Sequence, residues 1–446
     1  MSTASATTSD KDPGRMLIRL IVLAIPIGLL AGIGSALYNI FQHELQYWLW
    51  HTLPELLGQE REPWWLVVGL LVVGAVLVAL ALQLPGNGSD GPLKGFHLTI
   101  GPREVASVLL AALASLSFGA VLGPEAPLLA LGTAIAIAIS RSGQSGPVQV
   151  LALAGAGAAL GSILGNPLVS GVLLLELLLL SGKVTNPETG IFLLSPLIVA
   201  LTTGYLLQVG IEDWSGVPDL NLAVPGLPEY TSVQWIDLGV AIPVALVAGL
   251  IVVIARRLGG VLADRFEGKQ LASLLVGAGV VAAAALLMRA ITGESVSLVL
   301  FSGQEQMPEL LGLAGIGTLV AVVLFKGLAY AASLGAGFRG GPLFPAVFLG
   351  VGVGTAAAVL VSSVNLSAMV AAGIAAASAA GLRMPFSSML LAVLLCAAAG
   401  PAVTVLAGVG VVIGLILGLA LLPAAAAQEE RQERGGGSST PADRAM

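Results

Sequence analysis

A glycine–proline frame occurs twice in this chain, as GPEAPLLALG at residues 123–132 and as GPLFPAVFLG at residues 341–350. Both copies read G-P-x-x-P-x-x-x-L-G and lie in sequence made mostly of Ala, Leu, Val and Gly. Only the first copy carries an acid, Glu125. Because a proline in the first turn of a helix gives up no hydrogen bond, each copy predicts a helix that begins inside apolar sequence.

The composition of the chain indicates a membrane protein. Of its 446 residues, 57% are hydrophobic and 10% are charged, and the mean hydropathy is +0.97. Soluble domains carry about 25% charged residues, and a spanning helix needs about 20 mostly apolar residues. Candidate spans are 16–36, 64–84, 240–253 with its apolar flank, 271–288, 316–334 and 403–422.

A constant offset relates the two halves of the chain. Gly123 and Gly341 are 218 positions apart, and the same offset maps segment 154–168 onto 372–386 without a gap. Transporter folds often contain inverted repeats, whose Gly/Pro-interrupted segments mark a site near the bilayer midplane. We therefore expect an all-α polytopic membrane protein with two inverted repeats and broken intramembrane helices.

The distribution of charge predicts regions and an orientation. We expect a disordered cytoplasmic leader (1–15), a first transmembrane repeat (16–208), an extracellular loop (209–235), a second transmembrane repeat (236–425) and a disordered cytoplasmic tail (426–446). Lys and Arg favour the cytoplasmic side; Lys11, Arg15 and Arg19 surround the first helix start, whereas segment 210–237 has five acids and neither Lys nor Arg. We therefore expect a multi-pass protein of the cell membrane with both termini in the cytoplasm.

The two frames also predict a binding site. Helix N-termini carry free N–H groups and a partial positive charge, so two of them converging in a low dielectric would hold an anion. Glu125 would then be a tethered competitor for that anion, or alternatively a solvated acid that caps a helix; the frames themselves could also be ordinary surface turns. The helix-start frame consists of Gly123, Pro124, Ala126, Pro127, Gly341, Pro342 and Pro345.

In this order the motifs resemble the CLC family of chloride channels and anion/proton antiporters. Stretch 115–132 is similar to the family's G-x-E-G-P motif, whose glutamate is the external gate and matches Glu125. Stretch 326–354 is similar to the glycine-rich run into G-x-F-x-P, where backbone amides bind the anion. PGNG at 85–88 resembles the family's G-S-G-I-P motif, and NPLVSGVLLLE at 166–176 resembles the helix after the gate. The resemblance spans about residues 82–423 and implies a homodimer with one pathway in each subunit.

Departures from the family pattern bear on the anion site. Asn87 stands where the family has a selectivity serine, and Ser89 is a competing candidate. Pro342 has no N–H, which leaves the two following amides as donors. The resemblance thus implies an anion-binding set of Asn87, Gly88, Ser89, Leu343 and Phe344.

Other departures bear on proton coupling. Glu176 matches the first of two adjacent acids that antiporters often carry, and we expect either a proton-path residue or a structural acid there. Leu177 replaces the second, the internal proton-transfer glutamate, and Ala425 stands where a tyrosine is expected near the last helix. Asn87 and Leu177 would also suit the family's fluoride-exporting branch.

The remaining polar residues suggest no further chemistry. Lys326, Arg339 and Arg383 could raise the positive potential near the pathway, although for Lys326 and Arg383 we favour snorkelling to an interface. The three histidines have no metal-ligand spacing and Cys396 is the single cysteine, so we expect no metal and no cofactor. The apolar segments lack paired catalytic groups, which argues against an enzyme, and no nucleic acid partner is implied.

The function expected from these observations is transmembrane transport of chloride, gated by Glu125 and either channel-like or weakly coupled to protons. A fully coupled chloride/proton antiporter, a fluoride exporter and a secondary transporter of another anion remain alternatives. The expected partners are chloride or a similar small anion, protons in the coupled case, the lipid bilayer and a second copy of the chain.

Overall fold

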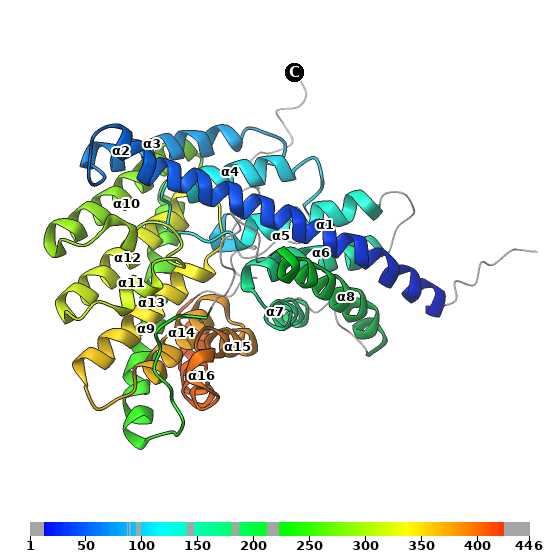
Figure 1. The fold of residues 1–446 in the computed structure, drawn as a ribbon. Coiled ribbons are helices and arrows are strands. Elements are labelled where there is room, and N and C mark those ends of the chain that lie inside the picture. Colours follow the sequence, from blue (N-terminus) through cyan, green and yellow to red (C-terminus); the bar gives the residue numbers. More distant parts are fainter. Residues whose placement is uncertain are drawn as a thin grey trace, which may run out of the picture.

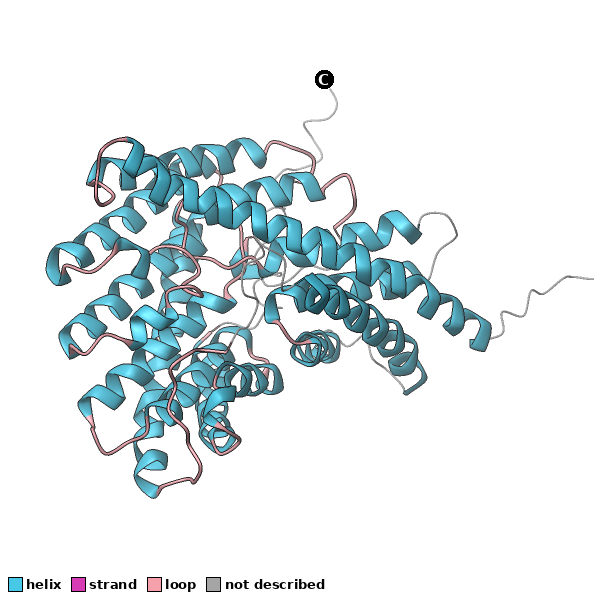
Figure 2. Cartoon of the chain, viewed as in Figure 1, coloured by secondary structure: helices cyan, strands magenta, loops and turns pink. Residues whose placement is uncertain are grey.

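The computed structural model describes residues 13–86, 88, 91–94, 100–140, 147–180, 187–211 and 223–422. These residues are mostly helical, and the β-structure among them is one isolated bridge (Figure 2). The helices, with 3-10 and π turns written η, are α1 (Pro13–Tyr47), η1 (Trp48–Thr52), α2 (Leu53–Leu56), α3 (Trp64–Ala81), η2 (Pro92–Lys94), α4 (Val105–Ser117), α5 (Glu125–Ser140), α6 (Pro147–Leu164), α7 (Pro167–Leu180), α8 (Pro187–Ile211), α9 (Trp235–Arg265), α10 (Gln270–Thr292), η3 (Val296–Leu298), α11 (Met307–Leu311), α12 (Ile316–Ala336), α13 (Leu343–Leu360), α14 (Leu366–Leu382), α15 (Pro385–Leu395), η4 (Ala397–Ala399) and α16 (Val403–Leu421).

Long and short apolar helices coexist in this fold. Eight helices in the described part of the chain are long and apolar enough to cross a membrane. In contrast, α15 has 11 residues, which at 1.5 Å per residue is about half of the roughly 30 Å hydrocarbon core. Helices that are apolar and yet too short to span are the broken helices that the sequence predicts, and the fold class is the all-α polytopic membrane protein expected.

The internal duplication is visible in the helix boundaries. The offset of 218 residues carries the first residue of α5, Glu125, onto the first residue of α13, Leu343. The same offset carries Pro167 at the start of α7 onto Pro385 at the start of α15. Prolines and glycines occur at matching positions in the two halves, and helices begin at these matching positions.

Matching glycines also give both halves the same helix packing. A Cβ at Gly132 of α5 would overlap the carbonyl of Gly155 in α6, and one at Gly350 of α13 would overlap the carbonyl of Gly373 in α14. These two pairs are again separated by 218 positions. Close approach of helix backbones through small residues is a common way for membrane helices to associate, and it is repeated here in each half.

Helices of the two halves pack against each other, and α12 and α13 are the most enclosed of them. Figure 1 shows α15 next to α7, and α3 next to α10, while α1 crosses α5, α6 and α8. The most enclosed spans are α12 and α13, with 72% of their most apolar window buried, against 28–50% in the other spans. The start of α13, which carries the second glycine–proline frame, therefore lies deep in the protein.

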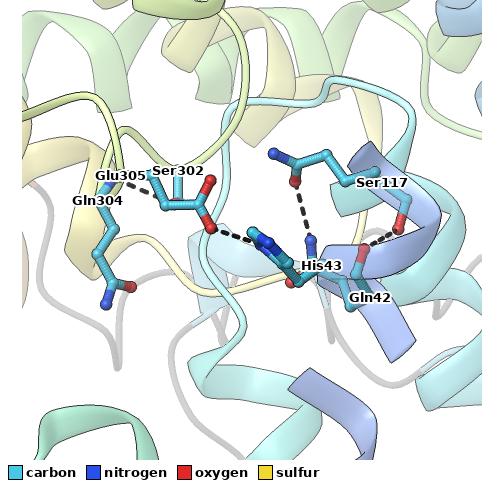
Figure 3. A network of polar contacts seen from close by, with 7 residues as sticks. Gln42, His43, Ser117, Ser302, Gln304 and Glu305 are labelled. Atoms are coloured by element: carbon cyan, nitrogen blue, oxygen red, sulfur yellow. Dashed lines mark hydrogen bonds and ion pairs between the residues drawn. The ribbon is translucent and has the colours of Figure 1, made fainter. Parts of the chain in front are cut away.

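A polar network holds the segment before the first frame against α1 (Figure 3). His43 Nδ1 lies 2.9 Å from Glu305 Oε1, so that α1 is paired with the loop before α11. The hydroxyl of Ser117, at the end of α4, donates to the carbonyl of Gln42 at 3.4 Å. The indole N–H of Trp50 donates to the carbonyl of Ser117 at 3.0 Å. These contacts join α1, α4 and the second half of the chain near the first frame.

Candidate functional site

The two glycine–proline frames meet at an antiparallel bridge. The N–H of Gly123 donates to the carbonyl of Gly341 at 2.8 Å, and the N–H of Gly341 donates to the carbonyl of Gly123 at 2.6 Å. These two residues occupy the same position in the two repeats. An antiparallel pair of equivalent residues has approximate local two-fold symmetry, so the bridge joins the two repeats at the same position of each.

Each frame continues from the bridge directly into a helix. After Pro124, helix α5 begins at Glu125, and after Pro342, helix α13 begins at Leu343. The frame residues are buried, with the exception of Ala126, which is half-buried. Turns at the surface would be exposed, so the frames are internal helix starts and the surface-turn alternative is wrong.

The carboxylate of Glu125 lies at the N-terminus of the opposite helix. Its Oε1 accepts the N–H of Phe344, in the first turn of α13, at 3.0 Å. The residue is fully buried, and its Oε2 has no hydrogen-bond partner among the described residues. No side chain of α13 caps its own N-terminus at Pro342; the acidic side chain of Glu125, from the first repeat, occupies this helix start in the second. This position excludes the solvated acid considered above.

A polar face of α12 supports both frames. Lys326, Tyr330 and Ser333 follow the spacing i, i+4, i+7, which places them on one side of a helix. The hydroxyl of Tyr330 donates to the carbonyl of Pro342 at 2.9 Å, and the hydroxyl of Ser333 accepts the N–H of Val121 at 2.9 Å. Tyr330 and Ser333 are not predicted as site residues from the sequence, although polar residues at helical spacing in an apolar span indicate a polar helix face.

Lys326, the third residue of this face, is fully buried, and the expectation that it snorkels to an interface is wrong. Its ammonium donates to the carbonyls of Leu300 at 2.7 Å and Phe301 at 3.1 Å, and lies 4.5 Å from the ring centroid of Phe348. Carbonyl dipoles and an aromatic face replace the water that a charged group otherwise requires. Lys326 thereby joins the loop after η3 to α13.

The first glycine-rich motif joins the site through Gly88. Its N–H donates to the hydroxyl of Ser107 at 2.7 Å, and its carbonyl accepts from Nε of Arg339 at 3.1 Å. The backbone N–H of Arg339 donates to the hydroxyl of Ser115 at 2.9 Å. Arg339 precedes the second frame by two residues, so all three motifs converge. Asn87 and Ser89, the expected side-chain contacts to an anion, lie outside the described residues, as does Ala425.

Glu176 occupies a second helix N-terminus in the same manner as Glu125. Its Oε1 accepts the N–H of Phe386 at 2.7 Å, and its Oε2 accepts the N–H of Ser387 at 2.7 Å and also the hydroxyl of Ser387. Helix α15 has no side-chain cap of its own at Met384. Glu176 in α7 therefore caps α15 from outside. Leu177, its neighbour, packs partly buried against the core.

Arg383 lies at the C-terminal ends of two helices. It follows the last residue of α14 with a φ of 59°, and its guanidinium donates to the carbonyls of Gly418 at 3.0 Å and Leu422 at 2.8 Å. A cation at the carbonyl end of a helix is electrostatically favourable. The guanidinium thus caps α16.

Comparison with known proteins agrees with this geometry. The family profile described as voltage gated chloride channel matches residues 86–418. "Putative ion-transport protein YfeO" of Escherichia coli O1:K1 / APEC is 26% identical over 355 residues, which cover 76% of this chain and 79% of that protein.

Three solved structures have a similar fold. A slow cyanobacterial Cl⁻/H⁺ antiporter superposes with a TM-score of 0.75 at 21% identity, covering 93% of this chain and 98% of that one. A eukaryotic CLC transporter gives 0.69 at 15% identity, with 94% and 74% covered. A CLC-type fluoride/proton antiporter gives 0.57 at 17% identity, with 91% and 96% covered. Because the family profile matches well over half of the chain and includes both glycine–proline frames, the chain belongs to the voltage-gated chloride channel (CLC) family.

Proposed function

We propose that this protein transports a small anion across the membrane, with chloride as the usual ion of its family, and that Glu125 is the gate. The observation that carries the proposal is the hydrogen bond from the N–H of Phe344 to the Glu125 carboxylate. The N–H groups at a helix start are a binding site for any anion of suitable size. A carboxylate tethered there excludes a mobile anion until it leaves.

The strength of this contact suits a removable gate. One hydrogen bond to a charged group contributes about 1.5–3 kcal/mol, which corresponds to a preference of roughly tenfold to a hundredfold. This stabilisation is partly offset because Oε2 is buried without a hydrogen-bond partner, which costs free energy. The carboxylate is therefore held weakly enough for an anion to compete with it, and protonation removes the charge that holds it.

The contacts of Glu176 favour channel-like or weakly coupled transport. Coupled exchange requires a residue that passes protons to the interior, and Leu177 stands where the family pattern has that acid. Glu176 next to it has both oxygens engaged by α15, which supports a structural role. Fully coupled exchange and fluoride export are the alternatives that flux measurements separate.

The proposed arrangement in the membrane follows the charge pattern and the resemblance. Both termini lie in the cytoplasm, and the acidic connection between α8 and α9 lies outside. The functional unit is a homodimer in a cell membrane, with one anion pathway in each subunit.

The test is anion flux in proteoliposomes that contain purified protein. Wild-type protein should pass chloride with a flux that rises as the pH falls, while Glu125→Gln should remove this pH response. Glu267→Gln, at an exposed position after α9, is the matched control and should behave like wild type. If flux and pH response are unchanged in Glu125→Gln, Glu125 is not the gate. If liposomes containing the wild-type protein are impermeable to chloride and fluoride, the protein does not transport small anions.

Coupling is read in the same liposomes from proton movement against a chloride gradient. Proton uptake well below a fixed stoichiometry is expected. Stoichiometric uptake would instead establish the coupled antiporter, and selective flux of fluoride would establish the exporter.

A further inference from the structure

The two bridging glycines face the carboxylate of Glu125. A Cβ built on Gly341 would overlap Oε2 of Glu125 and lie 2.5 Å from its Cδ, and its third neighbour, the Cβ of the same residue, is 3.0 Å away. A Cβ on Gly123 would lie 2.5 Å from Oε1 and 2.7 Å from Cδ of Glu125. In both cases the three nearest atoms belong to Glu125.

The backbone does not require glycine at these two positions. Neither Gly123 nor Gly341 has a positive φ, unlike Gly119 and Gly340 nearby. Their role also differs from that of helix-packing glycines such as Gly132, where an added Cβ would strike the backbone of a neighbouring helix. What both bridging positions provide is space for a carboxylate.

An independent observation points to a ligand in this space. Oε2 of Glu125 is buried, has no partner among the described residues, and is the atom that a Cβ at Gly341 would strike. The other carboxylate oxygen, Oε1, accepts the N–H of Phe344, so the carboxylate lies between this N–H group and the two glycines that have no side chain. A mobile anion that replaces the carboxylate would fill the same volume.

We propose that Gly123 and Gly341 form the seat of the gate: the absence of side chains at this inter-repeat bridge admits the Glu125 carboxylate and fixes the size of the anion that replaces it. This proposal rests on the gating function proposed above. Since the bridge hydrogen bonds use only backbone atoms, an alanine at either position keeps the bridge and fills the seat. The expelled carboxylate then leaves the pathway open, and large anions lose access before small ones.

The test is a double-mutant cycle between Gly341→Ala and Glu125→Ala, with chloride flux measured across a range of pH. Gly341→Ala alone should lose the pH response of the wild type, because the carboxylate no longer enters. In the Glu125→Ala background the carboxylate is gone and only the Cβ of residue 125 remains, 3.0 Å away, so adding Gly341→Ala should change chloride flux much less than it does in the wild type and should lower nitrate flux. Gly317→Ala is the matched control, since a Cβ there meets open space in α12.

Thermal unfolding in detergent supplies a second readout that does not need transport. Gly341→Ala and, independently, Gly123→Ala should lower the unfolding temperature in the wild-type background and have little effect in the Glu125→Ala background. If the glycine-to-alanine substitutions have equal effects on stability and flux in both backgrounds, the proposal that these glycines form the seat is overturned. A Glu125→Ala protein with wild-type flux and pH response would instead overturn the gate itself, so the two failures are distinguishable.

Discussion

Substitution of Glu176 by glutamine tests whether this acid anchors a helix or carries protons. Glutamine keeps the size of the side chain and removes its charge. The carboxylate accepts two backbone N–H groups and one hydroxyl at the start of α15, whereas the amide offers a single acceptor oxygen. Its NH₂ group would face the N–H groups of α15, donor against donor.

The expected cost follows from these contacts. A hydrogen bond to a charged group contributes about 1.5–3 kcal/mol, and an unsatisfied buried donor adds about 1–3 kcal/mol. The substitution also removes the cost of burying a carboxylate, which offsets part of this loss. We expect Glu176→Gln to lower the free energy of unfolding by about 2–4 kcal/mol, and Ser387→Ala, which removes one donor, by about 1–2 kcal/mol.

The assay is SDS-titrated unfolding of the purified protein for both single variants and the double variant. Because the two residues share one contact, the double variant should lose at least about 1 kcal/mol less than the sum of the single losses. Proton movement per chloride in liposomes should be unchanged in Glu176→Gln. A structural role for Glu176 is excluded if this variant unfolds within about 0.5 kcal/mol of wild type, the usual range of surface substitutions, and loses a proton flux that the wild type has.

Three further substitutions test the supports of the site. Tyr330→Phe leaves the buried carbonyl of Pro342 without its donor and should lower stability by about 1–3 kcal/mol, with an altered chloride affinity measurable by isothermal titration; unchanged affinity and stability would contradict a supporting role. Ser333→Ala removes the acceptor of the Val121 N–H and should cost a similar amount in SDS titration, whereas a neutral result would mean that water replaces the hydroxyl. Glu305→Gln breaks an ion pair with α1 that is about half exposed and should change stability by less than about 1 kcal/mol; a larger loss would show that the network of Figure 3 is essential.

Much of the fold could be predicted because its signals are local in the sequence. Runs of apolar residues predict spans wherever they occur, and a proline in a first helical turn predicts where α5, α13 and α15 begin. The offset of 218 residues can be read from the sequence, and it predicts that the helices pack in the same way in both halves of the chain. Glu125 stands out because it is the only acid within two matching frames.

Several predictions failed or could not be made because their partners lie far away along the chain. The apolar sequence around Lys326 predicts a helix from which a lysine would reach an interface. It does not show that the carbonyls of Leu300 and Phe301 accept hydrogen bonds from its ammonium group. Glu176 was equally compatible with a proton path and a structural acid, and its contacts with α15 are not encoded near it in sequence. Tyr330 carries no motif of its own.

The amino-acid sequence alone predicts an all-α membrane protein of two related halves, with paired helix starts and one acid in the first of them. The pairing of Gly123 with Gly341 is seen only in the folded chain, as are the contact of Glu125 with a helix start 219 residues away and that of Glu176 with one 211 residues away. The physical reason is the nature of the partner: both carboxylates bind backbone N–H groups. Every residue except proline has such a group, so the sequence cannot mark the ones that folding will bring to an acid.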